Sequence, residues 1–370
     1  MTVSEAGPGD GPEQDLVVEL DGRPRPAIVD VGLLGAAEVG DELIVNVQAL
    51  DLALGSGGFD IVHVNLTRGL AADGGDGGAN VMKLNYTSLQ HAVTPVEEER
   101  LELPVERPVA VLALHGQLAA VAWAFAQRAP AGRLGYIQTE GGALPGGHSR
   151  TVRALRERGL LAGHLTAGAA FGGEGEAIST AGGLHHALRT LGFDAAVCGP
   201  GPGIVGSGSA LGHGGMSALD SAHAALALGC PTVLVARMSS GDHRARHRDI
   251  SHHTLTVLDL LLEPVTVALP AGIRSPVGAD LRAGLGAVFA GATVGPAAPA
   301  SDAQRPARIT RHDWRRAAVD LPSFAASGLP AETMGRGLTD DPVFFAAALA
   351  GGGALGELAA ECALGEPADA

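Results

Sequence analysis

The chain almost lacks lysine: Lys83 is the only one, and the other basic side chains are arginines and histidines. A Walker-type phosphate-binding loop needs a Gly-Lys-Ser/Thr sequence, and a pyridoxal or Schiff-base enzyme needs a lysine in its pocket. Lys83 precedes the first strand of the parallel sheet that we expect below. The scarcity of lysine therefore disfavours both classes of enzyme.

Cysteine and aromatic residues are also scarce. The three cysteines, Cys198, Cys230 and Cys362, have no Cys-x-x-Cys spacing, which argues against a disulfide framework and a structural zinc knuckle. Aromatic residues make up 3% of the chain, and the formal net charge is −15. Nucleic-acid binding needs a basic surface and stacking rings, so we expect no nucleic-acid partner. A homo-oligomer is compatible with this charge.

Long apolar runs are missing from the sequence as well. Stretches such as residues 109–114 and 256–262 are much shorter than the roughly 20 residues that cross a membrane. No charged region precedes an apolar segment at the N-terminus, so we expect a cytoplasmic protein without a membrane partner. A chain of 370 residues with 46% hydrophobic content is large enough for two domains and a substantial core.

Composition and periodicity divide the chain into five parts. Glycine, proline and acidic residues predict disorder at the start, short alternating runs predict antiparallel strands, and a glycine-rich stretch predicts a linker. We expect a disordered tail over 1–14, a small antiparallel β-barrel-like module over 15–68, a linker over 69–80, an α/β domain over 81–300 and a mostly helical C-terminal segment over 301–370.

The α/β domain is predicted from apolar, β-branched runs that alternate with helical segments. This alternation is typical of a parallel, Rossmann-like sheet with helices on both faces, and ligands bind at the carboxyl ends of such strands. The expected strands are residues 109–113, 134–137, 161–165, 194–198, 232–235 and 265–269. Because polar or glycine-rich loops follow the first five, we expect the functional site in these loops.

The loop after residue 235 concentrates positive charge in an otherwise acidic protein. It holds Arg244, Arg246 and Arg248, whose planar donors match a carboxylate or phosphate. We therefore expect an anionic ligand there. The alternative is a surface loop whose arginines pair with the protein's own carboxylates.

Four histidines lie in the same loop. His243 and His247 are four residues apart and are weak candidates for a metal site, since no His-Glu-x-x-His motif accompanies them. His252 and His253 follow Ser251, which is suited to cap the next helix. We expect one of this pair to face the ligand and to transfer protons.

The glycine-rich loop over residues 199–215 follows another expected strand. Its Gly-x-Gly-x-x-Gly pattern is a weak match to a dinucleotide fingerprint, because prolines and further glycines delay the helix that should begin within the motif. Bare backbone amides and hydroxyls there can still approach an oxyanion, and a histidine can add a proton-transfer group. The candidate residues are Gly201, Gly203, Gly206, Ser207, Gly208, Ser209 and His213.

Other strand ends and the C-terminal part supply further candidates. Glu140 is our expected carboxylate for a base or hydrogen-bonding role, and surface exposure is the alternative. His115 and Gln117 follow the first strand of the sheet. Arg336 lies in a loop that can cover the site as a lid or form an ion pair with Asp340 or Asp341. A Gly-x-Ser-x-Gly elbow is missing, which disfavours an α/β-hydrolase.

Four motifs together resemble an uncharacterised bacterial family that carries a domain-of-unknown-function label, with members mainly in actinobacteria and related Gram-positive lineages. The motifs are residues 139–145 (TEGGALP), 199–208 (GPGPGIVGSG), 246–254 (RHRDISHHT) and 333–342 (TMGRGLTDDP). The resemblance covers about residues 15–350. It implies a cytoplasmic bacterial protein, and it implies no particular reaction or cofactor.

The sequence favours an enzyme, a hydrolase or transferase, that acts on a phosphorylated or carboxylated small molecule at the carboxyl edge of the sheet. One alternative is a non-catalytic regulatory protein that binds a nucleotide or metabolite. A second alternative is an NAD(P)-dependent oxidoreductase that uses the glycine-rich loop.

Overall fold

The computed structural model describes residues 1–52, 58–69, 78–97, 99–143, 145–271 and 305–365. The chain divides into two compact units, Met1–Pro95 and Val96–Ala370. The boundary falls after Pro95 and not at residue 81, where we expected the α/β domain to begin. Part of the expected linker, residues 70–77, lies outside the described residues.

The first unit is built around a five-stranded sheet in the order β1-β2-β3-β5-β4. The β3–β5 pair is parallel and the others are antiparallel, so the sheet is mixed and not purely antiparallel as expected. Its elements are β1 (Thr2–Ala6), β2 (Glu13–Leu20), β3 (Arg23–Asp30), α1 (Val31–Leu34), β4 (Leu43–Asn46), α2 (Gln48–Asp51) and β5 (Asp60–Asn65), followed by a hairpin of β6 (Val81–Lys83) and β7 (His91–Val93).

Strand β1 lies in the tail for which we predicted disorder. Its backbone pairs with β2, and Val3 is buried in the small core with Val18 and Leu43. Composition alone predicted disorder for residues 1–14, but pairing with a neighbouring strand satisfies the backbone of β1 and of the start of β2.

The second unit contains the predicted parallel sheet, with eight strands in the order β11-β10-β9-β12-β8-β13-β16-β17. All pairs are parallel. The strands are β8 (Val109–Val111), β9 (Leu134–Thr139), β10 (Gly163–Ala167), β11 (Gly175–Ala177), β12 (Ala195–Pro200), β13 (Thr232–Leu234), β16 (Thr266–Pro270) and β17 (Asp313–Ala317). The six expected strands are therefore confirmed, whereas β11 and β17 were not predicted.

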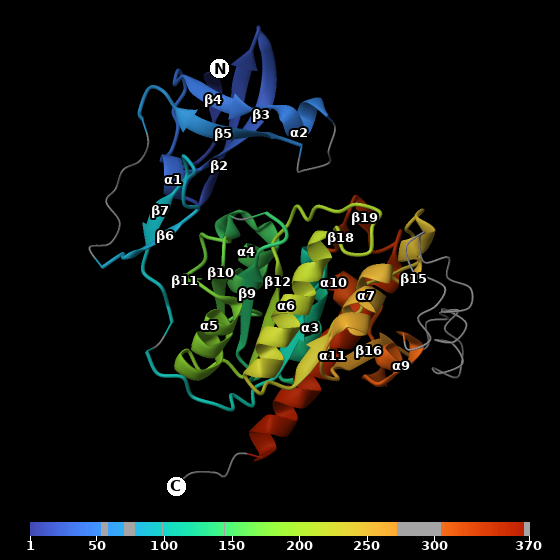
Figure 1. The fold of residues 1–370 in the computed structure, drawn as a ribbon. Helices are drawn as coiled ribbons and strands as arrows, with labels where there is room; N and C mark the ends of the chain where they lie inside the picture. Colours follow the sequence, from blue (N-terminus) through green and yellow to red (C-terminus); the bar gives the residue numbers. More distant parts are fainter. Residues whose placement is uncertain (53–57, 70–77, 98, 144, 272–304, 366–370) are drawn as a thin grey trace. The chain divides into compact units, whose positions relative to one another are not determined.

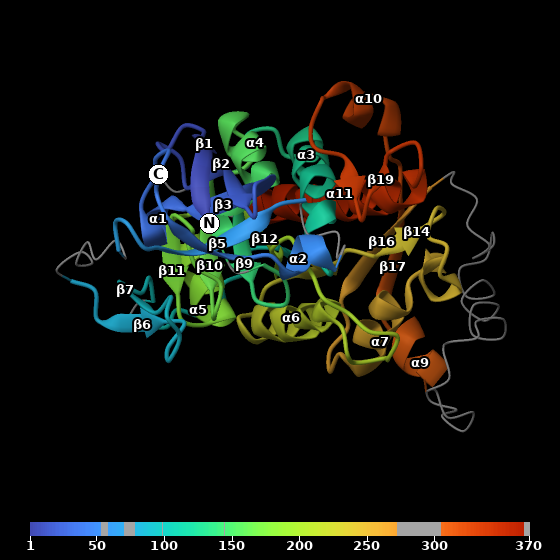
Figure 2. The ribbon, with the colours of Figure 1, turned by 90° about the horizontal axis from the view of Figure 1, so that it is seen from above.

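Helices cover both faces of this sheet (Figures 1 and 2). Each layer buries its own apolar cluster against the sheet. One layer contains α3 (Leu118–Arg128), α4 (Arg150–Glu157), α10 (Leu321–Ala326) and α11 (Pro342–Gly365), and the other contains α5 (Thr180–His185), which continues as a π-helical turn (His186–Thr190), with α6 (Ser217–Ala227), α7 (His252–Leu260) and α9 (Arg305–Thr310).

Helix α11 corrects our expectation that no apolar segment is long enough to span a membrane. Among the described residues, its Pro342–Leu364 stretch has the length and composition for this, but 78% of its most apolar window is buried inside the protein. A Cβ on Gly352 would lie 2.3 Å from the Val121 carbonyl oxygen, so α11 and α3 pack backbone against backbone. Helix α11 is thus a core helix of the second unit.

The connections diverge at the carboxyl edge of the sheet. After β8 the chain continues into α3 on one face, whereas after β12 and β13 it continues into α6 and α7 on the other. Neighbouring loops that diverge in this way form the usual ligand site of doubly wound sheets. Two short hairpins add to this edge: β14 (Met238–Ser239) with β15 (Asp249–Ile250), and β18 (Glu332–Thr333) with β19 (Arg336–Gly337).

Candidate functional site

The arginine-histidine loop is organised around Asp242. Its side chain is buried, and Arg244 donates two hydrogen bonds to it, from Nε to Oδ1 over 2.9 Å and from Nη2 to Oδ2 over 2.8 Å. Burial opposes the ionisation of Asp242, but the hydrogen bonds and charge of Arg244 outweigh it and hold the pKa of Asp242 well below its usual range. Asp242 is therefore ionised, and arginines of the site gather around its carboxylate.

Two more arginines contact Asp242. Arg336, on β19, lies 3.3 Å from Asp242 and 3.3 Å from Asp341. The exposed Arg248 donates from Nε to the carbonyl oxygen of Asp242 over 3.1 Å. The alternative that these arginines pair with the protein's own acceptors thus describes Arg244, Arg248 and Arg336 in this structure.

Arg246 differs from these neighbours. Its Nε is buried and has no hydrogen-bond partner among the described residues. A Cβ on Gly208 would lie 3.9 Å from Arg246 Nη1, so the glycine-rich loop after β12 meets the arginine loop after β13 at this side chain. The convergence that the parallel sheet predicted is present, and it leaves one guanidinium N–H buried without a partner among the described residues.

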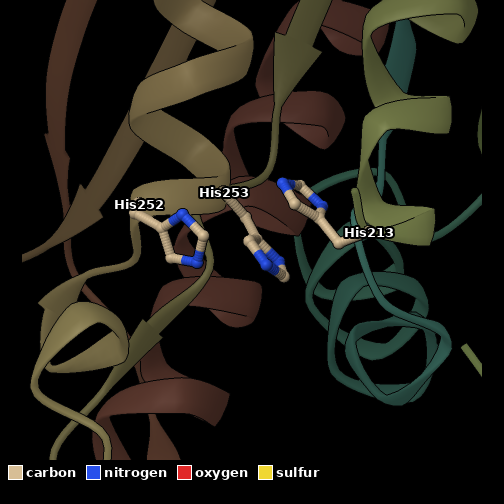
Figure 3. A group of neighbouring side chains, drawn as sticks. All are labelled: His213, His252 and His253. Atoms are coloured by element: carbon tan, nitrogen blue, oxygen red, sulfur yellow. The ribbon is translucent and has the colours of Figure 1, made fainter. Parts of the chain in front are cut away.

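Four buried imidazoles lie beside this point: His213, His247, His252 and His253. The rings of His213 and His253 are stacked, with centroids 3.4 Å apart and planes at 10°. The His252 ring centroid lies 4.4 Å from that of His253 and 4.9 Å from that of His247. Figure 3 shows His252 and His253 at the start of one helix, α7, and His213 facing them from the loop before α6.

Hydrogen bonds fix the proton positions on two of the rings. His213 Nε2 lies 3.0 Å from the Ala210 carbonyl oxygen, which can only accept, so Nε2 carries the proton and Nδ1 holds a lone pair. Arg237 Nη1 donates to His253 Nδ1 over 2.8 Å, so the neutral His253 carries its proton on Nε2. His213 Nδ1 and His252 Nε2 are both buried, and neither has a hydrogen-bond partner in the described part of the chain.

The imidazoles are neutral at neutral pH. Burial, followed by the neighbouring His213 and Arg246, lowers the pKa of His252 from 6.5 to about 4. Burial and Arg237 lower the pKa of His247 to about 3, and they place that of His253 far below its usual value. Burial likewise lowers the pKa of Arg237 to about 10. The site is thus a positive environment that disfavours added protons.

A metal ion is the other ligand to consider at this cluster. One nitrogen from each of His213, His252 and His253 lies within 4.8 Å of the others. An imidazole lone pair lies in the ring plane, and the parallel planes of His213 and His253 cannot both contain one ion. Arg237 also occupies His253 Nδ1. As placed, the three rings do not form a three-histidine metal site.

The two histidines of the weaker candidate metal site, His243 and His247, lie in different surroundings. His243 is exposed, whereas His247 is buried with Nδ1 2.8 Å from the Ser251 hydroxyl. Ser251 in turn caps α7 through the backbone amide of His253.

The glycines of the loop after β12 serve close packing of the backbone. A Cβ on Gly142, in the loop after β9, would lie 2.3 Å from the Gly201 carbonyl oxygen, and one on Gly214 would lie 2.0 Å from that of Gly141. Gly203 has a φ of 77°, a conformation that favours glycine. Much of the glycine pattern is therefore explained by contact between two neighbouring loops.

The hydroxyls of this loop bind the loop itself. Ser207 Oγ lies 2.8 Å from Ser209 Oγ, and they hold the carbonyl and amide of Gly212 respectively. An isolated bridge between Gly206 and His213 closes the turn. Helix α6 begins only at Ser217, so no helix starts within the Gly-x-Gly-x-x-Gly pattern.

Three further candidates lie elsewhere on the carboxyl edge. Glu140 is exposed, and its carboxylate lies beside Gly168, which follows β10 on the side of β9 away from β12. Gln117 is buried; it accepts from the amides of residues 113 and 114 and donates to the Ala236 carbonyl oxygen over 3.1 Å. Its polar atoms therefore join β8 to the end of β13.

His115 belongs to a second buried polar group. Its Nε2 lies 2.8 Å from the Ser149 hydroxyl and its Nδ1 lies 3.3 Å from the Tyr136 hydroxyl, while the Tyr136 ring stacks on His164. We did not identify Tyr136, Ser149 or His164 from the sequence. A histidine inside the apolar strand β10 was the available signal for His164.

The fold defines a doubly wound parallel α/β unit, and buried histidines gather with arginines at the carboxyl edge of its sheet. The chain belongs to the family described as "Protein of unknown function (DUF3866)", whose model matches residues 27–352. This confirms the resemblance to an uncharacterised family. No curated protein and no solved structure matches the chain.

Proposed function

We propose that the protein is a cytoplasmic enzyme, a hydrolase or transferase, that acts on a phosphorylated or carboxylated small molecule held between the loops after β12 and β13. One observation carries this proposal. Arg246 Nε, His252 Nε2 and His213 Nδ1 are buried polar atoms without a hydrogen-bond partner among the described residues. Such groups cost about 1–3 kcal/mol each when they stay unsatisfied, so a bound ligand is the simplest reason to keep them.

The local charge supports an anion over a cation. Arg237, Arg244 and Arg246 lie close to the histidines, while Asp242 is the acidic partner that the structure gives to Arg237 and Arg244. The Arg246 charge is close enough to lower the pKa of His252. A cluster of positive charge in a chain of net charge −15 concentrates small anions.

The histidines supply the proton chemistry. An anion beside His252 offsets the charge of Arg246 and raises the pKa of His252 toward its usual value, so ligand binding itself prepares an acid or base. Glu140 is exposed on the side toward β10. We therefore assign the proton-transfer role to His252 and His213, with His253 and Arg237 holding the ring of His213 in place.

The two other functions predicted from the sequence receive less support. A dinucleotide needs a helix that begins within the glycine pattern, and here α6 begins at Ser217. A regulatory protein would bind the same anion but release it unchanged, so turnover separates it from an enzyme.

The test is to purify the full chain under mild conditions, release its small molecules by denaturation, identify them by mass spectrometry, and then assay the native protein with them. Arg246→Gln removes the available guanidinium, and His243→Ala changes an exposed histidine of the same loop as a matched control.

We expect an anionic metabolite from the wild type and from His243→Ala, at least tenfold less from Arg246→Gln, and turnover by the wild type. Equal amounts in all three proteins would contradict the anion site. Binding without turnover of the released compound or its esters would replace the enzyme by the regulatory protein.

A further inference from the structure

One hydrogen-bond acceptor and one donor, both fixed and both buried without a partner among the described residues, lie on the two loops that meet at Gly208. His213 Nδ1 can only accept while its Nε2 proton is bound to the Ala210 carbonyl, and Arg246 Nε can only donate. A fully deprotonated oxyanion offers acceptors alone and would place a lone pair against His213. A ligand that contacts both groups must therefore present both an anionic oxygen and an O–H.

We propose that this site selects oxyanions that still carry an O–H group, with the anionic oxygen bound by Arg246 and the O–H donated to His213 Nδ1. This rests on the proposed anion site and names its ligand class. Hydrogen phosphate and 2-hydroxycarboxylates share this chemistry. Sulfate and simple carboxylates have the charge but lack the O–H at neutral pH.

The structure holds His213 in its accepting form. His213 is only 6% exposed, and its ring is stacked on that of His253. His253 cannot accept the O–H in place of His213, because its Nδ1 already accepts from Arg237 and its Nε2 carries the proton. The backbone amide of Gly214 bonds to the Val205 carbonyl, and the Gly206–His213 bridge closes the turn, so the carbonyl of Ala210 stays in reach of Nε2. Exchanging the two ring protons would break that bond.

An unpartnered lone pair on His213 also suits a metal ion, and two observations favour the oxyacid. The stacked planes of His213 and His253 prevent a shared ion, and the surrounding arginines repel a divalent cation. A site for an anion with an O–H uses both the lone pair and the positive charge.

The experiment compares matched anions by isothermal titration calorimetry of the full chain, treated with chelator, at pH 7 and constant ionic strength. Phosphate is compared with sulfate, and glycolate with acetate, so that the phosphoryl and hydroxy-acid sources are distinguished. We expect the ligand with the O–H to bind on the order of 10- to 100-fold more tightly in at least one pair, which corresponds to one buried hydrogen-bond mismatch.

Two variants separate selectivity from affinity. His213→Leu removes the acceptor and should reduce the preference to about twofold or less, while Arg246→Gln should weaken both members of a pair by at least about tenfold and keep their ratio. His243→Ala should match the wild type. A purely structural role of His213 would not change the ratio of two affinities measured on the same folded protein.

A measurement on the wild type avoids any effect of mutation on folding. Nitrogen-15 correlation spectra of the histidine rings should show one ring with Nε2 protonated and Nδ1 bare, whose Nδ1 resonance shifts on addition of phosphate and is lost in His213→Leu.

Three results would overturn the inference. Equal affinities within both pairs, with a loss in Arg246→Gln, would refute the selection for O–H and leave the anion site standing. No binding of any of the four anions would refute both. Tight binding of Zn²⁺ that is lost in His213→Leu, together with anion binding only in its presence, would assign the lone pair to a metal.

Discussion

Replacing Asp242 by Asn tests whether this carboxylate holds the arginines of the site together. Asn keeps the size of the side chain but removes the charge that faces Arg244, Arg336 and Arg237, at 2.8, 3.3 and 3.8 Å. The side chains of Asp242 and Arg237 are 0% and 3% exposed, whereas that of Arg244 is 33% exposed and contributes less. Removing one partner of a buried ion pair costs about 3–5 kcal/mol, so we expect a loss in that range.

Urea unfolding at pH 7 measures this loss, with Asp313→Asn as the control. Asp313 pairs with Arg315 at 2.6 Å on the surface, with side chains 54% and 40% exposed, so its loss should cost less than about 1 kcal/mol. A change below 1 kcal/mol in Asp242→Asn, with an unchanged slope against urea, would refute the role of Asp242.

The pH dependence of the same variant gives a second readout. The pKa of Asp242 is lower in the folded state than its ordinary value of 3.8, because the hydrogen bonds of Arg244 outweigh burial. The unfolded state therefore takes up the proton first, and the stabilisation is complete above about pH 4 and lost as the pH falls below it. Asp242→Asn should remove this part of the acid-induced loss of stability, and an unchanged acid profile would contradict the ionised state of Asp242.

Three further predictions concern packing, hydrogen bonding and pH. Gly142→Ala should lower the unfolding free energy by about 1–3 kcal/mol, since its Cβ would meet the Gly201 carbonyl oxygen at 2.3 Å. Gly353→Ala in α11 is the control: a Cβ there meets nothing within 4 Å, so this change should be neutral or stabilising by up to about 1 kcal/mol. Equal effects of the two changes in urea unfolding would contradict the packing account. Gln117→Leu should lower the unfolding free energy by at least about 1–3 kcal/mol, because two buried amides lose their acceptor. The phosphate affinity of the folded protein should stay within twofold. A larger change in affinity, measured by calorimetry, would show that Gln117 contacts the ligand. The pKa of His252 is lowered from 6.5 to about 4 in the folded state, so the unfolded state takes up the proton first as the pH falls. The unfolding free energy should therefore decrease by on the order of 3 kcal/mol through that pH window. His252→Asn should remove this part of the pH dependence, and an unchanged pH dependence in urea unfolding between pH 7 and 4 would contradict the assignment.

The parallel sheet was predictable because its central strands are apolar on both faces. Strands β8, β9 and β12 are buried throughout, and continuous β-branched runs are the signature of such strands. Strand β17 has the sequence Asp-Trp-Arg-Arg-Ala at the edge of the sheet, where exposure permits charged residues, so the hydrophobic pattern did not reveal it. Residues 313–317 accordingly add an unpredicted strand to a C-terminal part that is otherwise mostly helical over the described residues 305–365.

The convergence of the candidate loops was predictable, and the contacts of their residues were not. Parallel topology alone brings the loops after β12 and β13 to one edge, which is why His213 and Arg246 were candidates. Which arginine is available depends on Asp242 and Asp341, and Asp341 is almost a hundred residues away in the sequence. The proton position on His213 depends on one backbone carbonyl. Such contacts are tertiary, so sequence patterns do not encode them locally.

The most direct test of the anion site is a crystal structure of the full chain grown with phosphate at neutral pH. The account predicts phosphate density within hydrogen-bond distance of Arg246 Nε, His252 Nε2 and His213 Nδ1, three buried atoms without a partner among the residues described here. Phosphate bound elsewhere with these atoms filled by water, or a metal ion coordinated by the histidines in its place, would contradict the central claim.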